Sequence, residues 1–231
     1  MHAIRLLTIS ILIIISLASI TSEQYIEAVS YNKAKQFTIQ VNDPTSLRLV
    51  ENEALMKNLS LGELSIKVAN LAVGNNPLDV AVNPTTNIAY VTDNDDSNMS
   101  VIDSTRMIVV KTLPVGGSPE AVATNPNTNM VYVANSDDNT TSVIDGKTNS
   151  VVKTLPVGKY PQAVATNPNT NMVYVANTLG DTVSVIDGKT NSVVKTLPVR
   201  NQPWGIAVNP NTNMVYTANA GDNSMSIVLT E

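Results

Sequence analysis

The sequence predicts an all-β protein assembled from four copies of one small antiparallel sheet. Three observations predict this class. An Asn-Pro pair recurs every 42 residues, at positions 83, 125, 167 and 209. Each period contains four short runs rich in β-branched residues. The runs are separated by Asn, Asp, Gly and Pro, which are the residues of tight turns, and this punctuation leaves no apolar stripe of helical period.

The Asn-Pro spacing sets the limits of the repeat units, which run over 73–114, 115–156, 157–198 and 199–231. In the second unit the four runs read EAVAT, MVYVAN, TSVID and SVVKTL. NPNTN joins the first two runs and DGKTN joins the last two, and both connections have the length and composition of hairpin turns. Each unit is therefore predicted to fold as a four-stranded antiparallel meander.

Repeats of this length favour propellers or solenoids, and four-stranded sheets set around an axis form a β-propeller, in which each sheet covers the apolar face of the next. The stretches VYVAN at 131–135 and 173–177, YVTD at 90–93, and SVIDGKTNSVVKTLPVG resemble the YVTN family of β-propeller repeats, common in archaeal surface-layer-like proteins. This resemblance covers roughly residues 65–231. It implies a propeller fold and an extracellular setting but no particular activity. Such propellers commonly have about seven blades, whereas four units are present here.

The last unit holds only 33 of the 42 positions and lacks the fourth run. The segment LSIKVANLA, residues 64–72, stands directly before the first unit and aligns with the fourth run of the others. We expect this N-terminal strand to pair into the last blade and close a four-blade ring, because closure removes both exposed sheet edges. The alternative is a half-ring that a second copy completes to eight blades.

Two segments precede the repeats. Residues 1–22 place Arg5 before an apolar stretch from Leu6 to Ile20, the pattern of a signal peptide. A span needs about 20 apolar residues, so a retained anchor is the less favoured interpretation. Residues 23–63 do not match the repeat; the apolar positions after Asp43 suggest a capping helix, and a strand in QFTIQV is left open. A secreted or cell-surface protein is expected, with no stable membrane span once the leader is cleaved.

Composition narrows the possible partners. The chain has a net charge of −5, and loss of residues 1–22 removes one more Arg, which argues against nucleic acid as a partner. It contains no Cys, so burial and strand pairing must supply its stability. Sequons at Asn58, Asn98 and Asn139 predict glycosylation of an exported protein.

Units 115–156 and 157–198 are identical at 34 of 42 positions, and their differences fall in two windows, 117–120 and 136–141. The first window enters the first strand of a unit, and the second joins the second strand to the third. In a meander these two connections lie at one end of the sheet, whereas NPNTN and DGKTN lie at the other. Drift in the longer loops is one explanation for the pattern. The other is that this end binds a partner.

The second explanation defines a candidate binding surface. Trp204, the single Trp of the chain, occupies the repeat position of Leu78, Glu120 and Gln162, expected at the mouth of the central channel. A buried wedge is the alternative role for Trp204. A mixed aromatic and polar patch would suit a protein or a sugar. The predicted partner-binding residues are Trp204, Tyr160, Lys159, Arg200, Asn76, Leu78, Glu120 and Gln162.

The chain lacks the residues of several catalytic classes. His2, inside the predicted leader, is the single histidine, so serine-triad and zinc-hydrolase mechanisms are excluded for the mature chain. The resemblance implies the same for lyases and redox enzymes among related propellers, which generally use His or Cys. The acidic stretches at 93–98 and 135–139 lack the full pattern of a calcium loop and are expected to be solvated. No catalytic residue, metal or cofactor is assigned.

Recurring aromatic and sulfur-containing residues are assigned to the framework, because a position repeated in every blade usually packs between sheets. These residues are Tyr90, Tyr132, Tyr174 and Tyr216, with Met130, Met172 and Met214 beside them.

The predicted function is non-enzymatic recognition of an extracellular protein or glycan through the variable loops, or a structural role at the cell surface by self-association. The alternative is a metal-dependent hydrolase or lyase with a carboxylate site at the channel mouth.

Overall fold

The computed structural model describes residues 6–9, 28–31, 37–40 and 69–229, and the chain divides into two compact units, Met1–Val68 and Ala69–Glu231. Within Met1–Val68, an antiparallel sheet has the strand order β1-β3-β2; its strands are β1 (Leu6–Ile9), β2 (Ala28–Tyr31) and β3 (Phe37–Gln40). The QFTIQV segment, whose conformation the sequence left open, therefore contains a strand. The predicted capping helix and Asn58 lie outside the described residues. Among those described, no helix is long and apolar enough to cross a bilayer.

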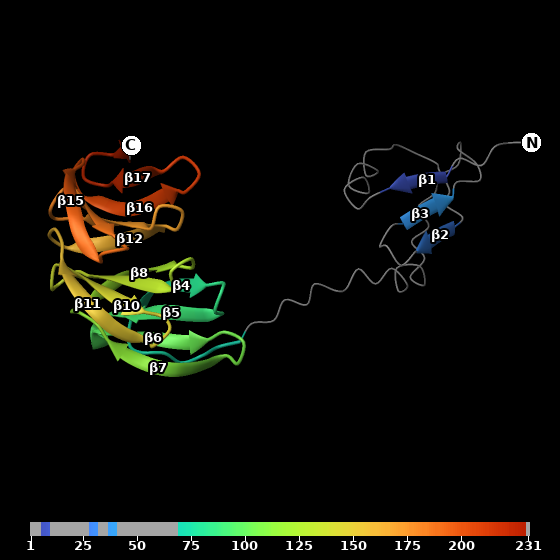
Figure 1. The fold of residues 1–231 in the computed structure, drawn as a ribbon, viewed down its shortest axis with the longest axis horizontal. Coiled ribbons are helices and arrows are strands. Elements are labelled where there is room, and N and C mark those ends of the chain that lie inside the picture. The colour runs from blue at the N-terminus through green and yellow to red at the C-terminus, as the bar shows by residue number, and fades with distance from the viewer. Residues whose placement is uncertain (1–5, 10–27, 32–36, 41–68, 230–231) are drawn as a thin grey trace, which may run out of the picture. The chain divides into compact units, whose positions relative to one another are not determined.

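The second unit is built from the repeats and contains four antiparallel sheets, which we call blades 1 to 4 (Figure 1). Each blade follows chain order, and the first three have four strands while blade 4 has three. Blade 1 contains β4 (Pro77–Asn83), β5 (Ile88–Asp93), a short 3₁₀ helix η1 (Asn94–Asp96), β6 (Asn98–Asp103) and β7 (Ile108–Pro114). Blade 2 contains β8 (Pro119–Asn125), β9 (Met130–Asn135), β10 (Thr140–Asp145) and β11 (Ser150–Pro156). Blade 3 contains β12 (Pro161–Asn167), β13 (Met172–Asn177), β14 (Thr182–Asp187) and β15 (Ser192–Pro198), and blade 4 contains β16 (Pro203–Asn209), β17 (Met214–Asn219) and β18 (Ser224–Val228). The all-β propeller of four meander blades is thus confirmed.

The turn residues explain why each strand reverses where it does. Asn87, Asn129, Asn171 and Asn213 end the four turns between first and second strands, and each has a positive φ of 55 to 58°. Asn tolerates this left-handed conformation better than most residues, which accounts for its place at the end of each NPNTN-type turn. The Asn that opens the same turn accepts a hydrogen bond from the backbone two residues on, as at Asn125 Oδ1 and Asn127 N, 3.1 Å apart.

The core lies between the blades. The second and third strands of the inner blades are buried on both faces because each sheet is covered from two sides, as at Val131, Tyr132 and Val133 in β9, which are 0% exposed. One side of each blade contributes a Tyr, and Tyr90, Tyr132 and Tyr174 are all at most 1% exposed. The framework role predicted for these three is therefore confirmed, whereas Tyr216 in blade 4 is only half-buried.

Every blade junction joins two chemically different sides. One side of blade 1 supplies Tyr90, Met99, Val101 and Leu113, and the facing side of blade 2 supplies Val122, Val131, Val133 and Ile144. A side-chain hydrogen bond repeats at each junction: Asn83, Asn125 and Asn167 donate through Nδ2 to Oδ1 of Asn129, Asn171 and Asn213, at 2.7, 2.7 and 2.9 Å. We call the Tyr-bearing side of a blade its donor side and the opposite one its acceptor side.

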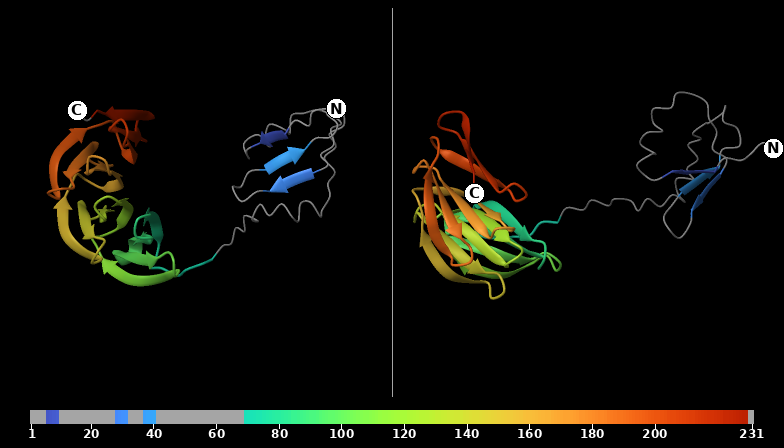
Figure 2. Two further views of the ribbon diagram at one scale, coloured as in Figure 1. Left: turned by 45° about the vertical axis from the view of Figure 1, so that its right-hand side comes forward. Right: turned by 45° about the horizontal axis from the view of Figure 1, so that its top comes forward.

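The blades follow an arc, and its two ends do not meet (Figure 2). The first strands β4, β8, β12 and β16 are neighbours in turn along the inner side of the arc. The closing strand predicted at 64–72 is not formed among the described residues: 69–73 belong to no strand, and β18 pairs with β17 alone. Residues 64–68 lie outside the described part of the chain. The difference follows from curvature, because the three junctions turn the chain too little for blade 4 to reach blade 1 (Figure 2).

The buried tyrosines predict how stability depends on pH. Burial, and secondarily the charge of Asp187, raises the pKa of Tyr132 to about 12 from 10.0. Burial likewise raises the pKa of Tyr90. Because the folded-state pKa is above the unfolded one, this contribution to stability is fully present below pH 10.0 and is lost as the pH rises toward about 12. We expect the free energy of unfolding to fall over this window, and to fall less steeply in Tyr132→Phe. Denaturant titrations across the window measure both slopes; equal slopes would assign the loss to other groups.

Candidate functional site

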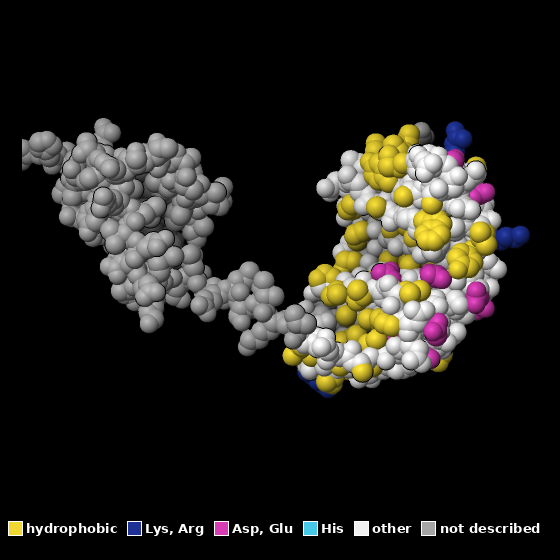
Figure 3. Space-filling model, turned by 180° about the vertical axis from the view of Figure 1, so that it is seen from behind, with side chains coloured by type: hydrophobic (Ala, Val, Ile, Leu, Met, Phe, Trp, Pro, Cys, Tyr) yellow, Lys and Arg dark blue, Asp and Glu magenta, His cyan; other side chains and the backbone are white. Residues whose placement is uncertain are grey.

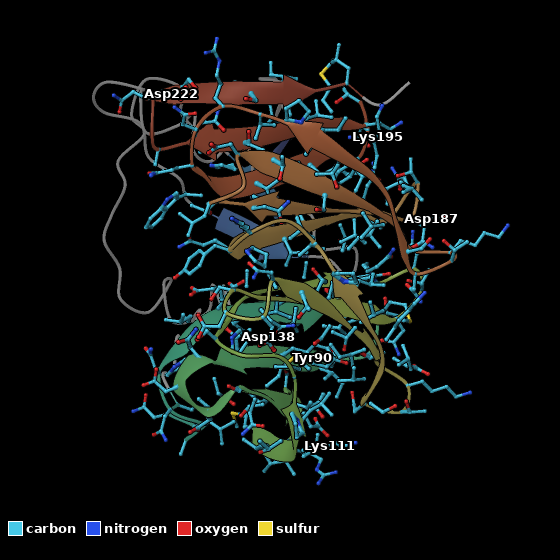
Figure 4. The ribbon with its side chains drawn as sticks, turned by 90° about the vertical axis from the view of Figure 1, so that its left-hand side faces the viewer. Tyr90, Lys111, Asp138, Asp187, Lys195 and Asp222 are labelled. Carbon is cyan, nitrogen blue, oxygen red and sulfur yellow. The ribbon has the colours of Figure 1, made fainter. Side chains whose placement is uncertain are left out.

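The loops of the repeat unit gather at two opposite ends of the sheets. One end carries the loops that lead into each first strand (74–76, 116–118, 158–160, 200–202) and the loops between second and third strands (94–97, 136–139, 178–181, 220–223). We call this end the variable face. The other end carries the NPNTN-type and DGKTN-type turns, which bond to each other through Gly146 N to Asn129 O, 2.9 Å, and Gly188 N to Asn171 O, 2.8 Å. Figure 4 shows Asp222 and Asp187 at these opposite ends.

The two windows that differ between blades 2 and 3 contact each other. In blade 2, Gly117 N donates to Asp138 Oδ2 at 2.7 Å, and Ser118 Oγ donates to Asp137 Oδ2 at 2.7 Å. Ser136 Oγ lies 3.3 Å from Glu120 Oε1. The two loops therefore form one structure, so a substitution in one changes the contacts of the other.

The equivalent two loops of blade 3 are joined by the same backbone hydrogen bonds as in blade 2 but carry different side chains. Thr178 N donates to Tyr160 O at 2.9 Å, and Leu179 N donates to Lys159 O at 3.2 Å. Thr178 Oγ1 lies 3.1 Å from Gln162 Oε1, which repeats the Ser136 and Glu120 contact of blade 2 with a different pair. A constant backbone frame therefore presents acidic groups in blade 2 and Lys, Tyr and Leu in blade 3.

Tyr160 stands in a backbone conformation that its side chain does not favour. Its φ is 55°, and the same left-handed conformation recurs at Asn76, Ser118 and Gln202. A bulky residue there costs roughly 1–2 kcal/mol relative to its relaxed conformation. The backbone bond from Thr178 N and a bond from Tyr160 N to Asn139 Oδ1, 2.8 Å, hold the loop in place. Because the conformation recurs in every blade, it belongs to the turn, and Tyr160 is the one aromatic residue of the four at this position.

Trp204 is 54% exposed, so the structure shows a surface residue and not a buried wedge. It follows the buried Pro203 in β16, the innermost strand of blade 4. The partner loop of this blade carries Ala220 where blades 2 and 3 have Ser136 and Thr178, so no hydroxyl is placed to bond the residue at position 204.

The remaining predicted residues lie on the same face but are spread over several blades. Lys159, Arg200 and Asn76 are exposed, and Leu78 is 47% exposed. Glu120 and Gln162 are half-buried and bonded within their own blades. The structure thus arranges them as a broad surface. Figure 3 shows apolar side chains along the hollowed side of this unit, where the inner strands lie.

Sequence reasoning missed Leu179, which is 62% exposed in the variable face beside Lys159. The signal was present, because 179 is a counterpart of Asp137, one of the positions that differ between units 115–156 and 157–198. Of the predicted glycosylation sites, Asn139 is exposed in the variable face and Asn98 is half-buried at the start of β6.

The acidic loops are engaged in hydrogen bonds. Asp96 Oδ2 accepts from Asn75 N at 2.8 Å, and Asp95 Oδ1 accepts from Asn76 Nδ2 at 3.0 Å. The bonds from Asn75 hold the pKa of Asp96 below its ordinary value. No group of three or more metal-ligating side chains is found within the described residues.

These features define the class of protein: a β-propeller of repeated blades, in which blades 2 and 3 share one frame and differ in the loops of one face. Comparisons with known proteins agree. The model of the YNCE-like β-propeller family matches residues 123–229. This match supports a β-propeller family, while the YVTN resemblance stays a prediction. No curated protein matches the sequence.

Two solved structures share the fold at low sequence identity. Hydrazine synthase from Kuenenia stuttgartiensis matches with a TM-score of 0.61 and 20% identity, over 70% of this chain and 48% of that one. A protein of unknown function from Desulfotomaculum acetoxidans DSM 771 matches with a TM-score of 0.58 and 19% identity, over 70% of this chain and 57% of that one. This chain therefore spans less than two thirds of either.

Proposed function

We propose that this protein is an exported, non-enzymatic β-propeller that recognises an extracellular protein or glycan through the variable face. The observation that carries the proposal is the contact between the two variable windows. Random drift would scatter differences over all exposed positions. Exposed residues of the NPNTN and DGKTN turns are nevertheless the same in blades 2 and 3, as at Lys147 and its counterpart Lys189. Change is instead concentrated in one bonded pair of loops.

The chemistry of the face supports recognition. Loops fixed by backbone bonds lose little conformational entropy on binding. Tyr and Trp are the residues most often found at binding hot spots, and Tyr160 and Trp204 are presented here from two neighbouring blades. Retention of Tyr160 at a left-handed position is explained if its ring contributes to binding, since Asn76 shows that the same turn accommodates Asn.

The test measures binding and stability together. We expect Tyr160→Asn to raise the free energy of unfolding by up to about 1 kcal/mol, through relief of the left-handed strain, while it weakens binding. Trp204→Ala should weaken binding as well. Binding is measured against a panel of immobilised extracellular polysaccharides and purified cell-surface proteins, and Trp204 fluorescence is a second reporter for the variants that keep Trp204.

Lys189→Ala, in a constant turn, is the matched control and should bind like the unmodified protein. Equal losses in all three variants, or no loss in Tyr160→Asn and Trp204→Ala, would reject the variable face as the binding surface. The non-enzymatic part of the proposal predicts that calcium and a chelator leave the melting temperature unchanged.

A further inference from the structure

The two ends of the arc expose apolar side chains at repeat positions that are buried inside it. At the blade 1 end, Val80 is 59% exposed, whereas Val122, its counterpart in blade 2, is 5% exposed. At the blade 4 end, Met225 and Ile227 are 59% and 51% exposed, whereas Val183 and Val185, their counterparts in blade 3, are 0% and 6% exposed. Each end therefore resembles an opened blade junction.

The two ends are complementary to each other. The blade 4 end is a donor side, with Tyr216, Met225 and Ile227 at the positions of Tyr90, Met99 and Val101. The blade 1 end is an acceptor side, with Val80 at the position of Val122.

The hydrogen bonds between Asn side chains that join neighbouring blades also stop at the two ends of the arc. Asn209 stands at the donor position of Asn83, and Asn87 stands at the acceptor position of Asn129. Within the described residues no hydrogen-bond partner is seen for Asn209 Nδ2 or for Asn87 Oδ1. Leu71 has the repeat position of Leu113 and Leu155 and is 40% exposed, whereas they are 7% and 4% exposed. A blade 1 placed one repeat step beyond blade 4 would satisfy all of these groups.

We propose that a second copy of this chain covers both ends, with its blade 1 on blade 4 of the first copy and its blade 4 on blade 1. The contact is the same junction that already joins the blades three times within the chain. The two copies are related by a twofold axis that coincides with the central axis of the ring. Both new junctions therefore form together, and an eight-blade ring closes. In this ring Leu71 of each copy lies beside β18 of the other, where Leu197 lies in blade 3.

The mass of the full chain in solution is the first test, by sedimentation and light scattering over a range of concentrations. We expect twice the monomer mass of 24.6 kDa. Val80→Glu and Ile227→Glu, one at each end, should each shift the protein to monomer. Val152→Glu is the matched control, since Val152 is 51% exposed on the outer strand β11, away from the ends, and should leave the dimer intact. A monomeric unmodified chain, larger open assemblies, or dimers that survive both end variants would overturn the proposal.

Cross-linking separates closure by a second copy from closure within one chain. The protein has no native Cys. The pair Pro84→Cys and Asn211→Cys, exposed residues at the two ends of the arc, should yield a covalent dimer when treated with a short bis-maleimide. The pair Asn127→Cys and Pro168→Cys has the same repeat positions at the junction of blades 2 and 3, where Asn127 Nδ2 donates to Pro168 O at 2.8 Å in an exposed contact; it is the positive control and should cross-link within one chain. A cross-link within one chain in the first pair, or none while the control reacts, would refute a second copy at the ends.

Discussion

Replacing Tyr132 by alanine should lower the free energy of unfolding of the repeat unit by about 3–5 kcal/mol, the largest effect of a single truncation expected here. Tyr132 is 0% exposed and packs in the cluster that joins blades 2 and 3 with Val173, Val175 and Ile186. Both sheets are fixed by their own hydrogen bonds, so the space left by the ring cannot readily collapse. Chemical denaturation followed by circular dichroism measures the change.

Tyr132→Phe is the control that separates packing from hydrogen bonding. It keeps the ring and removes the hydroxyl, whose bond to Asn191 Oδ1 is long at 3.3 Å. A loss of about 1 kcal/mol or less is expected at neutral pH. If the Phe and Ala variants were equally destabilised, the hydroxyl and not the packed ring would hold this junction together.

Replacing Asn125 by alanine should cost about 1–3 kcal/mol, because it leaves buried polar groups without partners. Asn125 is 0% exposed; its Nδ2 donates to Asn171 Oδ1 across the junction of blades 2 and 3, and its Oδ1 accepts from Asn127 N at 3.1 Å. The substitution removes a contact between blades and a contact within the turn. Denaturation curves of the variant and the unmodified protein measure the difference.

Asn127→Ala is the matched control, because Asn127 also bridges blades 2 and 3. Its Nδ2 donates to Pro168 O at 2.8 Å, but this bond is exposed to solvent. A change within about 0.5 kcal/mol is expected, since water replaces the lost partner. Equal losses in the two variants would show that burial does not decide the strength of these bridges.

The fold could be predicted from the sequence because the same pattern of strands and turns occurs four times. A single run such as MVYVAN is ambiguous, but its return every 42 residues between the same turns fixes strand, hairpin and meander together. The division into a constant and a variable end followed from the meander. The bonds that couple the two windows, such as Ser136 to Glu120, could not be predicted, because they depend on the relative position of two loops.

How the ring of blades closes could not be predicted from the sequence. Residues 64–72 have the residue pattern of a fourth strand, and this pattern is compatible with pairing within one chain or between two chains. The answer depends on how far each junction turns the chain, which is set by side-chain packing around Tyr132 and its counterparts. The role of Trp204 was open for a similar reason, because exposure depends on what stands beside the last blade.

The near identity of blades 2 and 3 has a consequence for how the chain reaches its native state. A strand such as β9 meets almost the same surface in β14 as in its own β10, since the two differ only at their second residue, Thr141 in β10 and Val183 in β14. Wrong pairings between neighbouring modules are therefore nearly as favourable as right ones at the start of folding. Short turns that reverse the chain at once bring each strand to its own partner first, so speed of local closure and not strength of pairing selects the correct arrangement.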